Sequence, residues 1–113
     1  MKSYAKTILL KNDPEKIAEY RRHHDQIWPE VVTSFRKVGV LDMRIWLIGY
    51  RLFMVMDTED DFDPDTDLEK YLQLDPKNDQ WESLMSSYQE PVPEARPGEH
   101  WADLELVFRM SDH

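Results

Sequence analysis

The sequence contains no cysteine and only three glycines among its 113 residues. Without cysteine the chain can form neither a disulfide framework nor a thiolate metal site, which favours a reducing compartment. No hydrophobic run approaches the length that spans a membrane, and the first residues lack the apolar core of a signal peptide. We therefore expect a cytoplasmic protein with no membrane partner.

Basic residues are also scarce, with 14 Lys and Arg against 23 Asp and Glu, which gives a net charge of −9. Nucleic-acid binding requires a basic patch that neutralises phosphates, so this balance argues against a nucleic-acid partner. Much of the negative charge lies in residues 57–67. This run lacks the spaced ligands and central glycine of a calcium-binding loop, and we interpret it as a solvated loop.

Four segments alternate apolar and polar residues, as β-strands do. They are residues 3–10, 41–48, 51–56 and 102–110. In the second segment the alternation places Leu41, Met43, Ile45 and Leu47 on one face. Arg44 and Trp46 fall on the other face. Gly49-Tyr50 supplies a tight turn, so the second and third strands are predicted to form a hairpin.

Helical patterns lie between these strands, at residues 14–25, 29–38, 67–74 and 79–88, with a break near Pro76. Asp13 followed by Pro14 is a strong helix start, because the side chain caps the first turn and proline fits there. Pro29 disfavours helical geometry just before it and begins the second piece, which Gly39 ends.

The order β-α-β-β-α-β predicts an α+β fold, the ferredoxin-like arrangement, with helices on one face of an antiparallel sheet. With 41% hydrophobic residues, 113 residues form one domain that spans residues 1–113. The second face of the sheet, with Trp46, would be bare. A small chain usually covers such a face by dimerising, so we expect a homodimer of the dimeric α/β barrel type.

Tyr20 and His24 lie four residues apart, so one helix carries both on the same face, which Ile17 and Ile27 make apolar. His23 points about 100° away and is expected to face water. A histidine aimed into a core beside a phenol is either a satisfied core residue or a catalytic one. Spacing alone favours the core interpretation.

The stretch Tyr20-x-x-x-His24-x-x-Ile27-Trp28-Pro29-Glu30 resembles the signature of the L-rhamnose mutarotase family, small sugar 1-epimerases that work without a cofactor. The resemblance extends over most of the chain. It includes Gly39, residues 52–56, Trp81-x-x-x-Met85 and residues 107–108. The segment 91–101 is more similar to members assigned to L-fucose than to those assigned to L-rhamnose.

This resemblance implies a role for five residues. His24 falls on the proton-donor position and Tyr20 on a substrate-binding tyrosine. Trp81 falls on the first of two adjacent tryptophans, with Glu82 in place of the second, and Met43 replaces another substrate-binding tyrosine. The implied substrate is a monosaccharide, a 6-deoxyhexose such as L-fucose or L-rhamnose, and neither metal nor cofactor is implied.

The chemistry of a mutarotase suits these residues. A base removes the proton of the anomeric O1 while an acid protonates the ring oxygen; the open aldehyde rotates and recloses. Histidine gives and takes protons near neutrality because its ordinary pKa is about 6.5. An indole such as that of Trp81 packs against the C–H face of a sugar.

Two other functions remain open at this point. One is a cofactor-free dimeric-barrel monooxygenase, which shares the predicted fold. The other is a non-catalytic sugar-binding or dimeric regulatory module. Individual residues also have structural interpretations: Trp28 packs in the core, Glu30 stabilises the positive end of a helix, and His100 and His113 are solvated.

Overall fold

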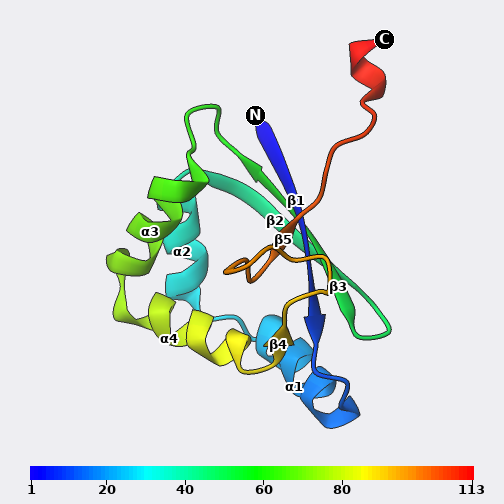
Figure 1. The fold of residues 1–113 in the computed structure, drawn as a ribbon. Coiled ribbons are helices and arrows are strands. Elements are labelled where there is room, and N and C mark those ends of the chain that lie inside the picture. Colours follow the sequence, from blue (N-terminus) through cyan, green and yellow to red (C-terminus); the bar gives the residue numbers. More distant parts are fainter.

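The computed structural model describes all residues, 1–113. Its elements are β1 (Lys2–Leu10), α1 (Pro14–Asp25), α2 (Pro29–Lys37), β2 (Val40–Ile48), β3 (Arg51–Thr58), α3 (Pro64–Leu74), α4 (Pro76–Ser86), β4 (Gln89–Glu90), β5 (Ala102–Asp103) and a 3₁₀ turn at Met110–Asp112. The antiparallel sheet has the order β2-β3-β1-β4, and β5 also pairs with β1. The helices lie on one side of it (Figure 1). The predicted ferredoxin-like α+β fold is confirmed, and within one chain the sheet is open rather than closed.

Three of the four helices begin with Asp followed by Pro. Asp13 accepts hydrogen bonds from the first-turn amides of α1, and Asp63 and Asp75 do the same for α3 and α4. Asp75 also ends α3, so the predicted break at Pro76 is confirmed. Because the capping aspartates directly precede Pro64 and Pro76, the helices α3 and α4 begin at these prolines. Each helix therefore begins three residues earlier than the apolar periodicity predicted.

The helix α2 begins at Pro29, as expected, after Trp28 in extended backbone. It ends before Gly39, whose φ of 104° lies in the left-handed region that glycine tolerates. The Gly39 carbonyl accepts a hydrogen bond from the Glu59 amide at 2.9 Å. This bond fixes the turn into β2 against the end of β3.

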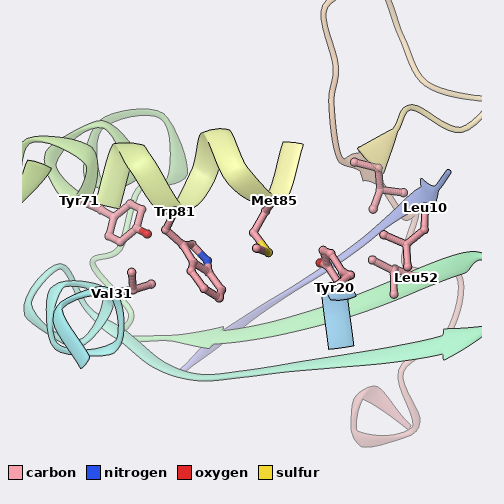
Figure 2. Close-up of a cluster of buried hydrophobic side chains, with 8 residues drawn as sticks. Leu10, Tyr20, Val31, Leu52, Tyr71, Trp81 and Met85 are labelled. Atoms are coloured by element: carbon pink, nitrogen blue, oxygen red, sulfur yellow. The ribbon is translucent and has the colours of Figure 1, made fainter. Parts of the chain in front are cut away.

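The strand register puts apolar side chains in rows beneath the helices. Ile8 pairs with Leu52 and Leu52 with Leu47, and the next row is Lys6, Met54 and Ile45. The helices add the remainder of the main core, in which Trp81 and Met85 hang from α4 toward the strands (Figure 2). We call this side the covered face.

One residue of β2 departs from the predicted alternation. A β-bulge between Val40 and Asp42 shifts the register, so Val40 is buried and Leu41 is 51% exposed. Leu41 therefore lies outside the predicted alternation, which Met43, Ile45 and Leu47 follow. A bulge inserts a residue whose presence no alternating pattern reveals.

The opposite side of the sheet carries no helix, and we call it the bare face. Its apolar side chains are Leu9, Trp46, Ile48, Phe53 and Val55, and charged side chains of the same face are Asp42, Arg44, Arg51 and Asp57. Trp46 is 51% exposed, and the Arg44 guanidinium lies 5.4 Å from its ring centroid. The predicted placement of Trp46 opposite Met43 is confirmed.

The predicted last strand, 102–110, is mostly absent. Only Ala102–Asp103 pairs with β1, and the Leu104 amide makes the final backbone bond to the sheet, to the Ala5 carbonyl. Residues 104–113, the C-terminal arm, then leave the body of the molecule (Figure 1). Its side chains Leu106, Val107 and Phe108 are exposed. Alternation signals an extended backbone, but it cannot supply the partner strand, and this chain offers none there.

Residues 91–101, the proline-rich loop, join β4 to β5. Val92 is buried, and two tight turns follow it, closed by the Ala95 and Glu99 amides. An ion pair between Arg51 and Glu94 holds the loop to β3 at 3.4 Å. None of the helices is both long and apolar enough to cross a membrane.

Candidate active site

An open cavity of about 1310 Å³ lies mainly between the helices and the covered face of the sheet, and it extends to Trp46 on the edge strand β2. All five residues predicted as site residues line it: Tyr20, His24, Met43, Trp81 and Glu82. They come from α1, β2 and α4, so segments far apart in the sequence converge here. Contact of these side chains with a sugar stays a prediction.

The His24 ring has a defined orientation and tautomer. Its Nδ1 donates a hydrogen bond to the Tyr20 carbonyl at 3.0 Å, so in the neutral ring Nε2 carries the lone pair. The ring centroid lies 4.5 Å from that of Tyr20 and 5.4 Å from that of Trp81. Burial lowers the pKa of His24, although the bond to the carbonyl opposes this shift. The neutral imidazole therefore dominates at pH 7, ready to accept a proton.

His23 does not line the cavity, but it does not face open water as predicted, and its ring centroid lies 6.4 Å from that of Trp81. It is partly buried, and its Nε2 lies 3.3 Å from the Tyr88 hydroxyl. Tyr88 donates its own hydrogen to Glu19 at 3.0 Å, so its oxygen accepts from His23. Tyr88 follows α4 in the chain, and helical spacing within α1 could not reveal this cover.

The buried phenol of Tyr20 accepts a hydrogen bond from a residue outside α1. Gln89 Nε2 donates to its hydroxyl oxygen at 3.2 Å, and His100 Nε2 donates to Gln89 Oε1 at 2.8 Å. Burial raises the pKa of Tyr20 to about 12, and the bond from Gln89 opposes the rise. The His100 ring is exposed, as predicted, yet its bond to buried Gln89 was not foreseen. Only the pairing of β4 with β1 brings Gln89 here, so no local pattern indicated it.

Glu82 supplies a partly buried carboxyl group. Its Oε1 accepts a hydrogen bond from the Tyr71 hydroxyl at 3.0 Å, and the Tyr71 ring stacks on Phe35 at 3.9 Å. Burial raises the pKa of Glu82, and the bond from Tyr71 opposes this. Burial and then the nearby Glu82 carboxyl raise the pKa of Tyr71. The cavity thus contains a carboxyl group that holds its proton more readily than a surface glutamate does.

Lys6 also lines the cavity and was not predicted as a site residue. It rises from the covered face of β1, and its Nζ lies 3.1 Å from Asp103 Oδ1. The sequence did contain a signal for Lys6, because it alternates in step with Ile8 and Leu10 and so shares their inward-facing side of the strand. A lysine in an inward-facing row usually marks a polar site. No group of three or more His, Asp or Glu side chains is placed to hold a metal ion.

Two neighbouring residues have structural roles. Trp28 packs against the main core, with its ring centroid 5.3 Å from that of Trp81, which confirms the core interpretation. Glu30 lies in the first turn of α2, where the helix dipole favours an acid. Its Oε1 lies 3.3 Å from Lys77 Nζ, so it also connects α2 to α4.

A neutral histidine, a phenol, a carboxyl group and an indole surround one cavity of a ferredoxin-like fold, a combination typical of acid–base chemistry on a small molecule. The family model described as L-rhamnose mutarotase matches residues 3–110. The chain belongs to the L-rhamnose mutarotase family, and it is accordingly an isomerase that acts on sugars. This assignment favours the epimerase prediction over the monooxygenase and non-catalytic alternatives.

Three proteins are similar to this chain in sequence or in fold. A Dictyostelium discoideum protein of the UPF0734 group is 40% identical over 96% of this chain and 90% of its own length. An L-fucose mutarotase of Xanthomonas campestris is 35% identical over 91% of this chain and 83% of its own. The crystal structure of an L-rhamnose mutarotase from Formosa agariphila superposes with a TM-score of 0.68 at 21% identity, covering 97% of this chain and 99% of that chain.

Proposed function

We propose that this mutarotase interconverts the α and β anomers of a 6-deoxyhexose, with L-fucose preferred over L-rhamnose and His24 as the proton-transfer residue. The observation that carries the proposal is the bond from His24 Nδ1 to the Tyr20 carbonyl. It leaves the Nε2 lone pair as the basic atom of a neutral, half-buried imidazole.

In the proposed reaction, His24 Nε2 removes the proton from the anomeric O1 of the sugar. The C1–O1 bond becomes a carbonyl while the C1–O5 bond breaks, and an acid of the cavity protonates O5. The aldehyde rotates about C1–C2, and O5 then attacks its other face. His24 returns its proton to O1 and O5 returns its proton to the acid, so the enzyme ends each cycle unchanged.

The remaining cavity residues bind the sugar in this proposal. The indole of Trp81 covers an apolar C–H face, and Tyr20 and Glu82 form hydrogen bonds with hydroxyl groups. Met43 makes an apolar contact where the resemblance has a tyrosine. Lys6 adds a charged donor from the sheet, partly held by Asp103.

Two observations support L-fucose over L-rhamnose. The relative named L-fucose mutarotase is similar along nearly the whole chain. In addition, Met43 cannot donate the hydrogen bond of a tyrosine, and Glu82 offers a carboxyl group in place of a second indole. A buried hydroxyl left without its partner costs more than a missing methylene, so these two changes alter which stereochemistry is accepted.

Saturation-transfer NMR on free sugars tests the proposal. We expect His24→Ala to lose about 10²–10⁴-fold of the accelerated anomer exchange, the usual contribution of an acid–base residue. His23→Ala is the matched control, because His23 is adjacent to His24 in the sequence but does not line the cavity. Circular dichroism verifies that both variants fold. Equal loss of exchange in the two variants would contradict the assignment, as would unfolding of His24→Ala alone.

The same experiment compares sugars. We expect faster exchange with L-fucose than with L-rhamnose at equal concentration. A clear preference for L-rhamnose would show that Met43 and Glu82 do not set specificity. No acceleration of either sugar would refute the choice of a 6-deoxyhexose.

We also propose that the protein is a homodimer joined through the bare face. Apolar side chains such as Trp46 and Ile48 are exposed there, and the C-terminal arm leaves the sheet with further exposed apolar residues. A second copy of the chain would cover the bare face and the apolar residues of the C-terminal arm at the same time. Light scattering at micromolar concentration should give the mass of a dimer, whereas a monomer mass would refute this proposal.

A further inference from the structure

A chain of hydrogen bonds connects the surface of the molecule to the cavity. It starts at exposed His100, passes through buried Gln89 and ends on the Tyr20 hydroxyl. Of these three residues, Tyr20 and Gln89 line the cavity and His100 does not. The His24 ring centroid lies 4.5 Å from that of Tyr20 on the cavity side.

The direction of these bonds follows from the atoms involved. Gln89 Oε1 can only accept, so His100 Nε2 must carry the hydrogen of the 2.8 Å bond. The amide nitrogen of Gln89 then faces Tyr20 and donates to its oxygen at 3.2 Å. Because Tyr20 accepts this bond, its own hydrogen is free to be donated to another group.

We propose that Tyr20 is the proton donor that complements His24 in ring opening, and that Gln89 and His100 are positioning residues that keep its hydrogen directed into the cavity. This inference rests on the proposed function. It gives Tyr20 a catalytic role in addition to binding, and it gives the exposed His100 a role at a site that it does not touch.

The proton balance is complete with these groups. As His24 Nε2 takes the O1 proton, the C1–O5 electron pair goes to O5, which takes the Tyr20 hydrogen and leaves a phenolate. The Gln89 N–H stabilises this phenolate. On ring closure O5 returns its proton to the phenolate, and the imidazolium of His24 returns its proton to O1.

The Gln89 side chain suits this task because it donates in both states of the phenol. Burial raises the pKa of Tyr20 and disfavours the phenolate, while the N–H of Gln89 acts in the opposite direction. A group that could only accept would capture the phenol hydrogen and withdraw it from the sugar. The bond from His100 prevents the amide from turning round to become such an acceptor.

The substitution Gln89→Glu tests this idea with little change of shape. A carboxylate accepts from both His100 and Tyr20, so it reverses the bond to the phenol. We expect exchange to slow by about 10²-fold, as much as in Tyr20→Phe, with no further loss in the double variant. Gln89→Met, which cannot donate in any protonation state, should also slow exchange. Unchanged exchange in Gln89→Glu or in Tyr20→Phe would overturn the proposal.

His100 provides a test with little disturbance of the interior, because this residue is exposed. His100→Phe keeps a ring but cannot donate, and we expect kcat to fall about fivefold with KM unchanged, the worth of one hydrogen bond. His100→Gln restores an N–H donor at a similar reach and should recover most of the rate. A loss in both variants, or in neither, would overturn the positioning role.

An absorbance titration of the phenols separates this proposal from the proposed function, since it needs no sugar. The difference between the wild-type protein and Tyr20→Phe isolates the titration of Tyr20. We expect Gln89→Glu to raise the pKa of Tyr20. An unmoved titration would overturn the hydrogen-bond chain, and a moved titration with unchanged exchange would overturn the donor role. Full exchange in His24→Ala would instead refute the proposed function.

Discussion

On the covered face of the sheet, polar side chains stand where a core is expected; on the bare face, apolar side chains stand where water is expected. Lys6 lies in the same row as Met54 and Ile45, whereas Trp46 and Ile48 are exposed. Both faces therefore depart from simple alternation, in opposite directions. Polar side chains on the covered face and exposed apolar side chains on the bare face therefore need separate functional explanations.

Three polar groups that line the cavity each have a partner. Lys6 meets Asp103, Glu82 meets Tyr71, and Tyr20 meets Gln89. Burying such groups is costly unless they are paired, so their retention around one cavity indicates chemistry. The apolar groups of the bare face are covered by no helix of the chain, which indicates assembly with another surface.

The largest expected effect comes from two isoleucines on opposite faces. Ile8 has no exposed surface, and Ile48 is 71% exposed. We expect Ile8→Ala to lower the free energy of unfolding by about 2–5 kcal/mol. Ile48→Ala should change it by no more than about 0.5 kcal/mol when unfolding of dilute, monomeric protein is measured with urea. Similar losses in both would erase the distinction between the faces.

The second effect concerns assembly. Trp46→Glu places a charge in the middle of the proposed interface, and we expect the dimer dissociation constant to rise by at least about 30-fold, because a central aromatic contributes about 2 kcal/mol or more. Leu74→Glu is the control, since Leu74 is exposed on α3 away from the bare face. Sedimentation of both variants measures this. A dimer unchanged by Trp46→Glu would move the interface elsewhere.

The third effect is the pH dependence of the covered face. The protonated imidazole of His24 cannot accept the O1 proton, so kcat/KM should fall as the pH falls through the pKa of His24. Burial lowers that pKa below its ordinary value of about 6.5. We expect kcat/KM to stay constant from pH 7 down to the lowered pKa of His24. Below that pKa it should fall tenfold per unit of pH. Loss of activity that begins above pH 7 would contradict a neutral His24.

The smallest effect tests the apolar part of the cavity around Met43. L-Galactose is L-fucose with a hydroxyl group on C6, so it differs only where a methyl group meets the protein. An apolar pocket discriminates weakly against one added hydroxyl, and we expect kcat/KM lower by about fivefold, or roughly 1 kcal/mol. Anomer exchange by NMR gives the ratio. Faster exchange with L-galactose would place a polar partner at C6.

Much of the fold follows from local sequence. Prolines at helix starts, glycine after α2 and period-two alternation in β1 and β3 each act within a few residues, so their structural result was predictable. The exceptions arise from distant partners. The arm after Asp103 lacks a strand beside it, and the bulge beside Leu41 depends on pairing with β3.

The candidate site also has one part that local sequence predicted and another part that depends on distant segments. Tyr20 and His24 belong to one helical face, so their proximity was visible in the sequence. Gln89 and His100 reach Tyr20 only through the sheet and the proline-rich loop. The cover of His23 by Tyr88 has the same origin. Local spacing gives neighbours on one element, and it contains no information on which other element packs against them.

The proline-rich loop has a consequence for the unfolded chain. Pro91, Pro93 and Pro97 restrict the backbone before folding as well as after it, so the segment has fewer conformations to lose. A proline in a compatible position lowers that entropy loss by about 0.4–1 kcal/mol. The segment that carries His100 and Trp101 can therefore remain ordered beside the cavity with few buried contacts, and a flexible loop of equal length would need more of them.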